Sequence, residues 1–111
     1  LQKIQSPIPE FIGEATRFYM EFHDAYQQIE GCVINDPLAL ALTFAPELCD
    51  YEEHFVDIDI QGGVSLGKTF ADFYKMTGKP ANMKVALGVR GRDFIELFLE
   101  RMEKLSKSIP A

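Results

Sequence analysis

The sequence predicts an α/β fold with two long helices, a short buried helix and about three strands. Apolar residues recur every three or four positions within 11–29 and 93–107, as they do on one face of an amphipathic helix. They alternate with polar residues within 55–60, 64–71 and 83–89, as in a strand with one face in solvent. With 111 residues, the chain can form one small domain or part of a larger one.

The first helix is predicted to begin directly after Ser6. A serine followed by Pro7 is typical of a helix N-terminus, because proline is tolerated in the first turn. Gly31 is the expected stop. Eight residues form the stripe that we expect to be buried: Phe11, Ile12, Ala15, Phe18, Tyr19, Phe22, Tyr26 and Ile29.

A polar pair, Asn35-Asp36, stands at the start of the second predicted helix. Asp36 followed by Pro37 indicates a helix N-cap and the first helical residue, since a carboxylate can accept an unpaired backbone N–H. The run from Leu38 to Phe44 is almost entirely apolar. It therefore predicts a short helix that is buried on most sides and ends before Pro46.

The central part of the chain reads as β structure. Gly62-Gly63 separates the two alternating runs 55–60 and 64–71, which favours an antiparallel hairpin. A polar loop leads to a third strand at 83–89. The closing helix carries an apolar stripe of Phe94, Leu97, Phe98, Met102 and Leu105. Its basic last turn complements the helix dipole.

Charge and cysteine content restrict the class of protein. The net charge is −6, from 17 acidic and 11 basic side chains. This balance argues against a nucleic-acid partner and against an anionic membrane surface. Cys32 and Cys49 should lie near opposite ends of a helix over 37–45, too far apart for a disulfide. Two unpaired thiols, with no signal peptide or membrane-spanning run, predict a cytoplasmic protein.

The stretch around Asn35 resembles the C-terminal signature of the inosine–uridine-preferring nucleoside hydrolases. That signature is a glycine, an apolar pair, His-Asp-Pro and a helix of small and apolar residues. The corresponding residues here are Gly31, Val33-Ile34, Asn35-Asp36-Pro37 and Leu38-Ala39-Leu40-Ala41. The aspartate and proline match, and the histidine is replaced by Asn35.

The resemblance continues in order over roughly residues 10–105. The matching pieces are Val56-Asp57-Ile58, Gly63, Gly67-Lys68-Thr69, Asn82 through Leu87, and Phe94 through Leu99. Family members are about three times as long as this chain, and their N-terminal Asp-x-Asp-x-x-x-Asp-Asp motif has no counterpart in it. The resemblance thus implies that residues 1–111, which open on Leu1, are a C-terminal fragment of a Rossmann-like nucleoside hydrolase fold.

The same resemblance implies a site chemistry. The family cleaves the N-glycosidic bond of nucleosides with a calcium-bound water, and Asp36 matches one of its metal ligands. Calcium requires six to eight oxygens, so we expect the fragment alone to bind none. Asp57 and Asp59 are the nearest further candidates for a ligand, and they also fit a solvent-exposed strand face. Asn35 stands at the position of the histidine that protonates a leaving purine, and a carboxamide does not titrate.

Three readings of Asn35 follow: the base is protonated by another route, the substrate differs, or catalysis is lost. Asn35 can also simply cap the turn before Pro37. By the same resemblance, Tyr19, His23 and Tyr26 are candidates for contact with the nucleoside base, although both tyrosines also fit the buried stripe. His54, in an acidic loop, is expected at the surface.

The sequence therefore leaves two functions open, which belong to different classes. The first is a nucleoside hydrolase-like protein whose fragment is inactive alone; the second is a non-catalytic binding or assembly domain. In either case, the many apolar side chains in few elements predict exposed apolar surface and self-association.

Overall fold

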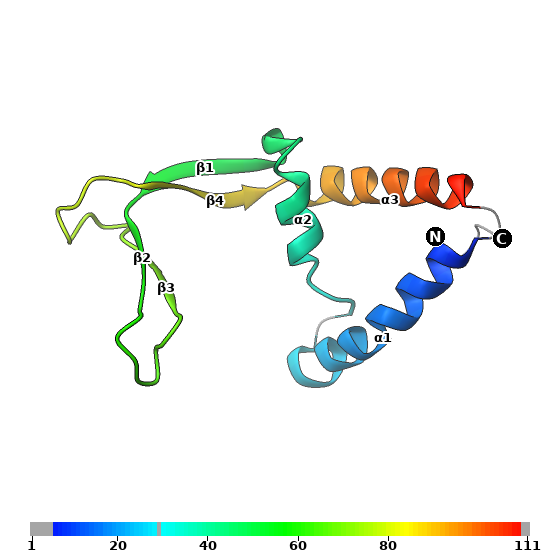
Figure 1. The fold of residues 1–111 in the computed structure, drawn as a ribbon, viewed down its shortest axis with the longest axis horizontal. Coiled ribbons are helices and arrows are strands. Elements are labelled where there is room, and N and C mark those ends of the chain that lie inside the picture. Colours follow the sequence, from blue (N-terminus) through cyan, green and yellow to red (C-terminus); the bar gives the residue numbers. More distant parts are fainter. Residues whose placement is uncertain (1–5, 29, 110–111) are drawn as a thin grey trace. The chain divides into compact units, whose positions relative to one another are not determined.

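The computed structural model describes residues 6–28 and 30–109. Two compact units make up the chain, one of residues 1–48 and 90–111 and one of Cys49–Val89. The first unit contains α1 (Pro7–Gln27), α2 (Asn35–Ala41), a short 3-10 helix η1 (Pro46–Leu48) and α3 (Gly91–Ser108) (Figure 1). The second contains β1 (Cys49–His54), β2 (Val56–Ile58), β3 (Thr69–Ala71) and β4 (Met83–Val89). The predicted α/β class is confirmed.

Helix α1 begins as the sequence predicts and ends earlier. The Ser6 hydroxyl accepts a hydrogen bond from the Ile8 N–H at 3.4 Å, and proline stands in the first turn. The helix stops at Gln27 because Gln28 adopts a left-handed conformation and its N–H bonds the His23 carbonyl. The predicted stop at Gly31 is wrong for this reason; Ile29 lies outside the described residues.

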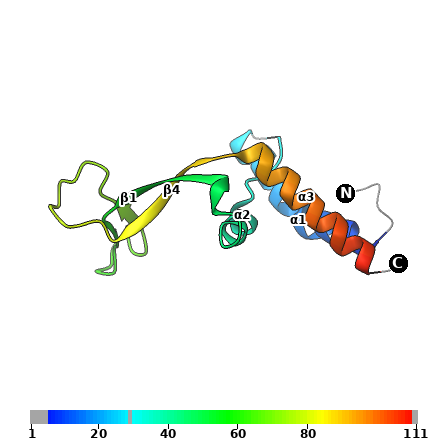
Figure 2. The same ribbon diagram turned by 90° about the horizontal axis from the view of Figure 1, so that it is seen from above.

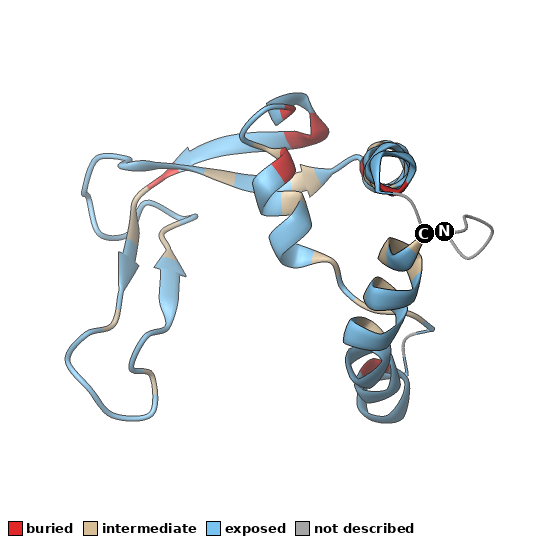
Figure 3. Ribbon diagram, turned by 45° about the vertical axis from the view of Figure 1, so that its right-hand side comes forward, coloured by how far each residue is buried: buried red, intermediate tan, exposed pale blue. Residues whose placement is uncertain are grey.

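The predicted buried stripe of α1 is also wrong in most of its length. Phe18 and Tyr26 are more than three quarters exposed, at 77% and 78%. His23 is the buried residue of this helix (Figure 3). Within the described residues, no helix combines the length and apolar character that a membrane crossing needs.

Helix α2 corrects the role assigned to Asp36. The helix starts at Asn35 with Ile34 in the N-cap position, and no side chain caps it. Asp36 is therefore the second helical residue and not the N-cap. Pro37 follows inside the first turn, where its missing N–H costs no helical hydrogen bond. The helix is not buried on most sides, since Leu40 is 67% exposed and Phe44, just beyond its end, is 57% exposed.

The core of the first unit lies between α2, η1 and α3. Its buried apolar residues are Ala41, Ala45, Leu48 and Phe94. The start of α3 is tied to η1 because the Arg90 N–H donates to the Leu48 carbonyl at 2.8 Å. The Arg90 guanidinium donates to the Glu47 carbonyl at 2.6 Å. Helix α3 also contacts α1 and α2.

The second unit contains two separate antiparallel pairs, β1–β4 and β2–β3. Strand β4 has the predicted bounds, and it runs alongside β1 from the pair Cys49–Val89 to the pair His54–Met83 (Figure 2). Strand β1 lies outside the three strands that the sequence predicts, at 55–60, 64–71 and 83–89. The predicted hairpin is confirmed in its antiparallel pairing, although its strands are three residues each.

Two polar side chains organise the loops of this unit. The Asn82 side-chain amide forms two hydrogen bonds with the backbone of Val56. It accepts one from the N–H at 2.8 Å and donates one to the carbonyl at 2.9 Å. The Asp72 carboxylate accepts the N–H groups of Met76 and Thr77, both at 2.9 Å, and the Thr77 hydroxyl at 2.7 Å. Asp72 thus stabilises the turn over residues 72–77, which lies between β3 and β4 in the chain.

Replacing Asn82 by alanine is expected to destabilise the chain by about 1–2 kcal/mol, because two hydrogen bonds to the β2 backbone are lost. Urea unfolding followed by circular dichroism measures this loss. Gln61→Ala is the matched control. The Gln61 residue is exposed, and its hydrogen bond to Asp59 is donated by the backbone N–H, which alanine retains. Equal unfolding midpoints for the two variants would mean that the hydrogen bonds of Asn82 to Val56 do not stabilise the chain.

Acid is expected to loosen the turn at Asp72. The N–H and hydroxyl of Thr77 lower the pKa of the Asp72 carboxyl below its ordinary value of 3.8. The resulting stabilisation is complete above the unfolded-state pKa and is lost as pH falls through the lowered folded-state pKa. Urea unfolding between pH 2 and 6 should therefore show a smaller acid-induced loss in Asp72→Asn than in the parent chain. Asp24→Asn, an exposed change on α1, should leave the loss unchanged.

Candidate functional site

A hollow of about 230 Å³ in the first unit lies between α1, the segment before α2 and the first turn of α2. We call it the site pocket. Helix α1 contributes two of its lining residues, and the rest come from the stretch 32–37. The lining residues are Thr16, Tyr19, Cys32, Val33, Ile34, Asn35, Asp36 and Pro37. The pocket thus joins the signature pair Asn35-Asp36 to one of the three predicted base-contacting residues.

Tyr19 reaches the pocket from the second half of α1. Its ring lies edge-to-face against His23, with 4.3 Å between ring centroids. His23 Nδ1 lies 2.8 Å from the Tyr19 carbonyl oxygen, so this nitrogen is the protonated one and donates. His23 is buried at 4% exposure. It therefore supports the turn that carries Tyr19.

His23 and Tyr26 do not line the site pocket. Tyr26 stacks at a tilt on Phe22, with ring centroids 5.0 Å apart, and is otherwise exposed. Contact of either residue with a nucleoside stays a prediction. The three residues share a helix face, but the pocket covers only the turn of α1 that contains Thr16 and Tyr19.

Sequence reasoning missed Thr16 and Cys32 as pocket residues. Thr16 precedes Tyr19 by three positions, a spacing that places both on one face of α1. The Thr16 hydroxyl donates to the Ile12 carbonyl at 2.7 Å, which fixes its orientation. Cys32 stands directly before the apolar pair of the signature. It carries a free, half-buried thiol, and Cys49 carries a free, buried one.

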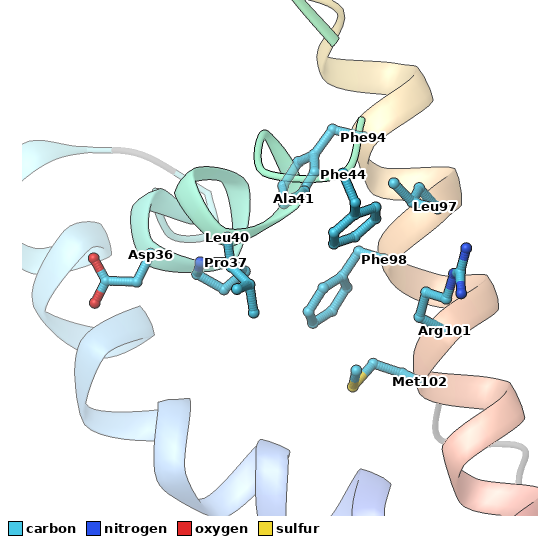
Figure 4. Close-up of a pocket in the computed structure, with 10 residues that line it drawn as sticks. All are labelled: Asp36, Pro37, Leu40, Ala41, Phe44, Phe94, Leu97, Phe98, Arg101 and Met102. Atoms are coloured by element: carbon cyan, nitrogen blue, oxygen red, sulfur yellow. The ribbon is translucent and has the colours of Figure 1, made fainter. Parts of the chain in front are cut away.

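Asn35 and Asp36 occupy the first turn of α2, and both side chains are exposed. In Figure 4 the Asp36 carboxylate points away from the aromatic rings of Phe44 and Phe98. Asn35 offers a carbonyl acceptor and two N–H donors and has no titratable proton. The pair can therefore bind polar atoms of a ligand, and only Asp36 supplies a charge.

The described residues do not form a complete calcium site. Among them, no three His, Cys, Asp or Glu side chains gather in a way that could hold a metal ion. Asp36 and Asn35 offer two side chains, whereas calcium takes six to eight oxygen ligands. In the second unit, the Asp59 carboxylate accepts hydrogen bonds from the Ser65 hydroxyl and the Gln61 N–H, and these bonds lower its pKa.

The second unit has a polar hollow of about 430 Å³. His54 lines it and is buried at 8% exposure, so the expected surface position of His54 is wrong. Its ring packs edge-to-face on Phe73, and Nε2–H donates to Glu52 at 2.9 Å. Asp72, Lys75 and Lys79 line the same hollow.

Comparison with known proteins identifies relatives of this chain. Residues 1–96 match the inosine-uridine preferring nucleoside hydrolases. A pyrimidine-specific ribonucleoside hydrolase of Shewanella oneidensis is 32% identical over 103 residues, which are 92% of this chain and 32% of that protein. A protein of the same description from Photobacterium profundum is 33% identical, again over 92% of this chain and 33% of its own length.

A solved structure agrees with these relatives. The purine-preferring ribonucleoside hydrolase from Gardnerella vaginalis superposes with a TM-score of 0.78 and 26% identity, over 96% of this chain and 34% of that chain. The present chain thus spans about one third of the length of its relatives. The match over residues 1–96 covers most of the 111 residues and confirms the family to which the sequence shows a resemblance. The chain belongs to the inosine-uridine preferring nucleoside hydrolase family.

Proposed function

We propose that this chain supplies part of the nucleoside-binding site of an enzyme that splits nucleosides into ribose and free base. The observation that carries the proposal is the site pocket, where Tyr19 lines the same hollow as Asn35 and Asp36. An aromatic ring beside two polar side chains suits a ligand with a planar base and a polar sugar. The relatives, which are described as pyrimidine-specific and purine-preferring ribonucleoside hydrolases, support the same substrate class.

Each side chain receives a distinct role in this proposal. The Tyr19 ring contacts the base, and Asn35 hydrogen-bonds the base or sugar through its amide. Because a carboxamide holds no titratable proton, Asn35 cannot serve as a general acid. Asp36 contributes one carboxylate oxygen ligand to a calcium ion, and the remaining ligands come from outside the described residues.

We also propose to which domain the chain belongs and in which compartment the protein lies. Residues 1–111, both units together, form the C-terminal part of one nucleoside hydrolase-like domain. On its own, the chain is expected to release no ribose and to self-associate through its exposed apolar residues. We place the protein in the cytoplasm because Cys32 and Cys49 are free thiols, as is usual in reducing compartments.

Asn35 favours a second candidate function. A site that binds a nucleoside through Tyr19, Asn35 and Asp36, but supplies no titratable donor to the base, can act as a non-catalytic binding or assembly domain. The two functions differ in one measurable respect, because both predict nucleoside binding and only the first predicts ribose release.

Nucleoside binding is expected to protect Cys32 from alkylation, because this thiol lines the site pocket. Peptide-level mass spectrometry after iodoacetamide treatment, with and without millimolar inosine or uridine, measures the labelling rates of both cysteines in one sample. Cys32 labelling should slow in the presence of nucleoside. Cys49, which is 6% exposed, should label slowly in both conditions.

Two tyrosine variants serve as matched controls for the protection. Tyr19→Ala should abolish the effect, because it removes the aromatic wall of the pocket. Tyr26→Ala, which changes an exposed tyrosine of the same helix outside the pocket, should retain it. Identical Cys32 labelling with and without nucleoside would exclude the pocket as the binding site.

Asn35→His tests the catalytic role in a protein that joins this chain to the rest of the nucleoside hydrolase fold. General-acid assistance is typically worth about 10²–10⁴-fold in rate, so hydrolysis of inosine should accelerate by that order. Because only protonated imidazole donates, the gain should be present below a pH of about 6.5 and disappear above it. The pH–rate profile with inosine is the measurement.

Asn35→Gln is the control that keeps the amide and adds no titratable group. Adding Asp36→Ala to Asn35→His should remove the gain, since the site then lacks its carboxylate. An unaltered pH–rate profile in a folded Asn35→His protein would mean that residue 35 does not face the leaving base.

A further inference from the structure

The polar hollow of the second unit shares no lining residue with the site pocket. Its volume of about 430 Å³ suits a small organic molecule better than a single ion. Two segments provide its charged and polar side chains. Glu53 and His54 stand at the end of β1, and Asp72, Lys75 and Lys79 come from the loop that follows β3. The hollow therefore offers groups of both charges to a ligand.

His54 has one ring nitrogen without a hydrogen-bond partner. Because Nε2–H donates to Glu52, Nδ1 is the unprotonated nitrogen and can only accept a hydrogen bond. Nδ1 is buried, and no group in the described residues donates to it. A buried acceptor without a donor is unfavourable, because it has lost its hydrogen bonds to water. A ligand that places a hydroxyl beside His54 would remove this cost.

Lys75 and Lys79 are available to an anion. Within the part of the chain that the structure describes, neither ammonium forms an ion pair with a carboxylate. Both residues are exposed, and the Lys79 ammonium lies 4.6 Å from the centre of the Phe55 ring. Asp72 does not compete for them, because its two oxygens accept three hydrogen bonds from the turn that follows it. Two ammonium groups four positions apart thus remain for an anionic ligand.

The loop that carries both lysines is held in place by its own hydrogen bonds. The Lys79 N–H donates to the Thr77 hydroxyl at 3.2 Å. At the end of the loop, the Asn82 N–H donates to the His54 carbonyl at 3.2 Å, which ties the loop to β1. A ligand that enters the hollow therefore meets walls that are already ordered, and less conformational entropy is lost on binding.

We propose that the polar hollow is a second ligand site, which binds a small hydroxyl-bearing anion of the sugar phosphate class. Lys75 and Lys79 bind the phosphate group as point charges. One sugar hydroxyl donates to His54 Nδ1, and the carboxylate of Glu53, which can only accept, takes another. Inorganic phosphate satisfies the lysines alone, and a neutral sugar satisfies only the acceptors. The site uses no residue of the site pocket, so it does not rest on the proposed function.

Isothermal titration calorimetry of the 111-residue chain with ribose 5-phosphate tests the site. Ribose 5-phosphate should bind more tightly than inorganic phosphate or ribose. Lys79→Gln should weaken its binding about tenfold, because a charged contact to the phosphate is lost. Lys68→Gln is the matched control and should bind as the parent chain does. Lys68 is also exposed and lies over an aromatic ring, 5.7 Å from the centre of Phe70, but does not line the hollow.

His54→Gln tests the hydroxyl contact. The glutamine amide nitrogen can replace Nε2 as the donor to Glu52, and no atom replaces Nδ1. This variant should bind ribose 5-phosphate about fivefold more weakly and inorganic phosphate as before. His54→Asn places an amide oxygen near the position of Nδ1 and should recover part of the loss. Circular dichroism checks that each variant is folded.

Three results would overturn the proposal. The first is no binding of ribose 5-phosphate at millimolar concentration, or equal binding by the parent chain, Lys79→Gln and Lys68→Gln. The second is inorganic phosphate binding as tightly as ribose 5-phosphate, which would mean that the acceptors of β1 take no part. The third is loss of binding in Tyr19→Ala, which would assign the ligand to the site pocket. Binding that Tyr19→Ala retains and Lys79→Gln weakens would support a second site.

Discussion

The packing of Phe94 against Ala41, Ala45 and Leu48 is the contact on which the first unit depends. Alanines at positions 41 and 45 leave room for the phenylalanine ring at the end of α2. Arg90 secures the same junction through the carbonyls of Glu47 and Leu48. Because α2 carries Asn35 and Asp36 on its first turn, this small core determines how the signature pair is presented to the site pocket.

A core of this size leaves apolar side chains at the surface. Only four apolar residues of the described first unit are buried together, whereas Phe18, Leu40 and Phe44 are more than half exposed. Small domains bury a low fraction of their surface, so their stability is marginal unless another contact adds to it. Any contact that buries Leu40 and Phe44 would therefore add to the stability of this unit.

Local patterns predicted those elements whose causes are local. The bounds of β4 follow from strict alternation over 83–89, and the start of α1 follows from Ser6 and Pro7. Strand β1 was missed because its sequence, Cys49 through His54, is mostly polar and its pairing with β4 joins residues far apart in the chain. Asp36 looked like a cap because Pro37 follows it, but α2 begins one residue earlier and includes both. Tyr19, His23 and Tyr26 share one face of α1, because they are spaced by four and three residues. The spacing does not show which of them lines the site pocket, since that depends on how residues 32–37 pack against α1.

The position of Asp36 connects the apolar and the polar parts of the molecule. Asp36 lines the apolar hollow between α2 and α3, while its carboxylate points away from the rings of Phe44 and Phe98 (Figure 4). The hydrophobic effect is strong but non-directional, and metal ligation is directional but needs several oxygens. Leu40 and Phe44 leave apolar surface on one side of Asp36, whereas the carboxylate on the other side offers a charge to polar atoms. The first turn of α2 thus joins two surfaces of different chemistry, and the core of Ala41, Ala45, Leu48 and Phe94 holds the helix that carries both.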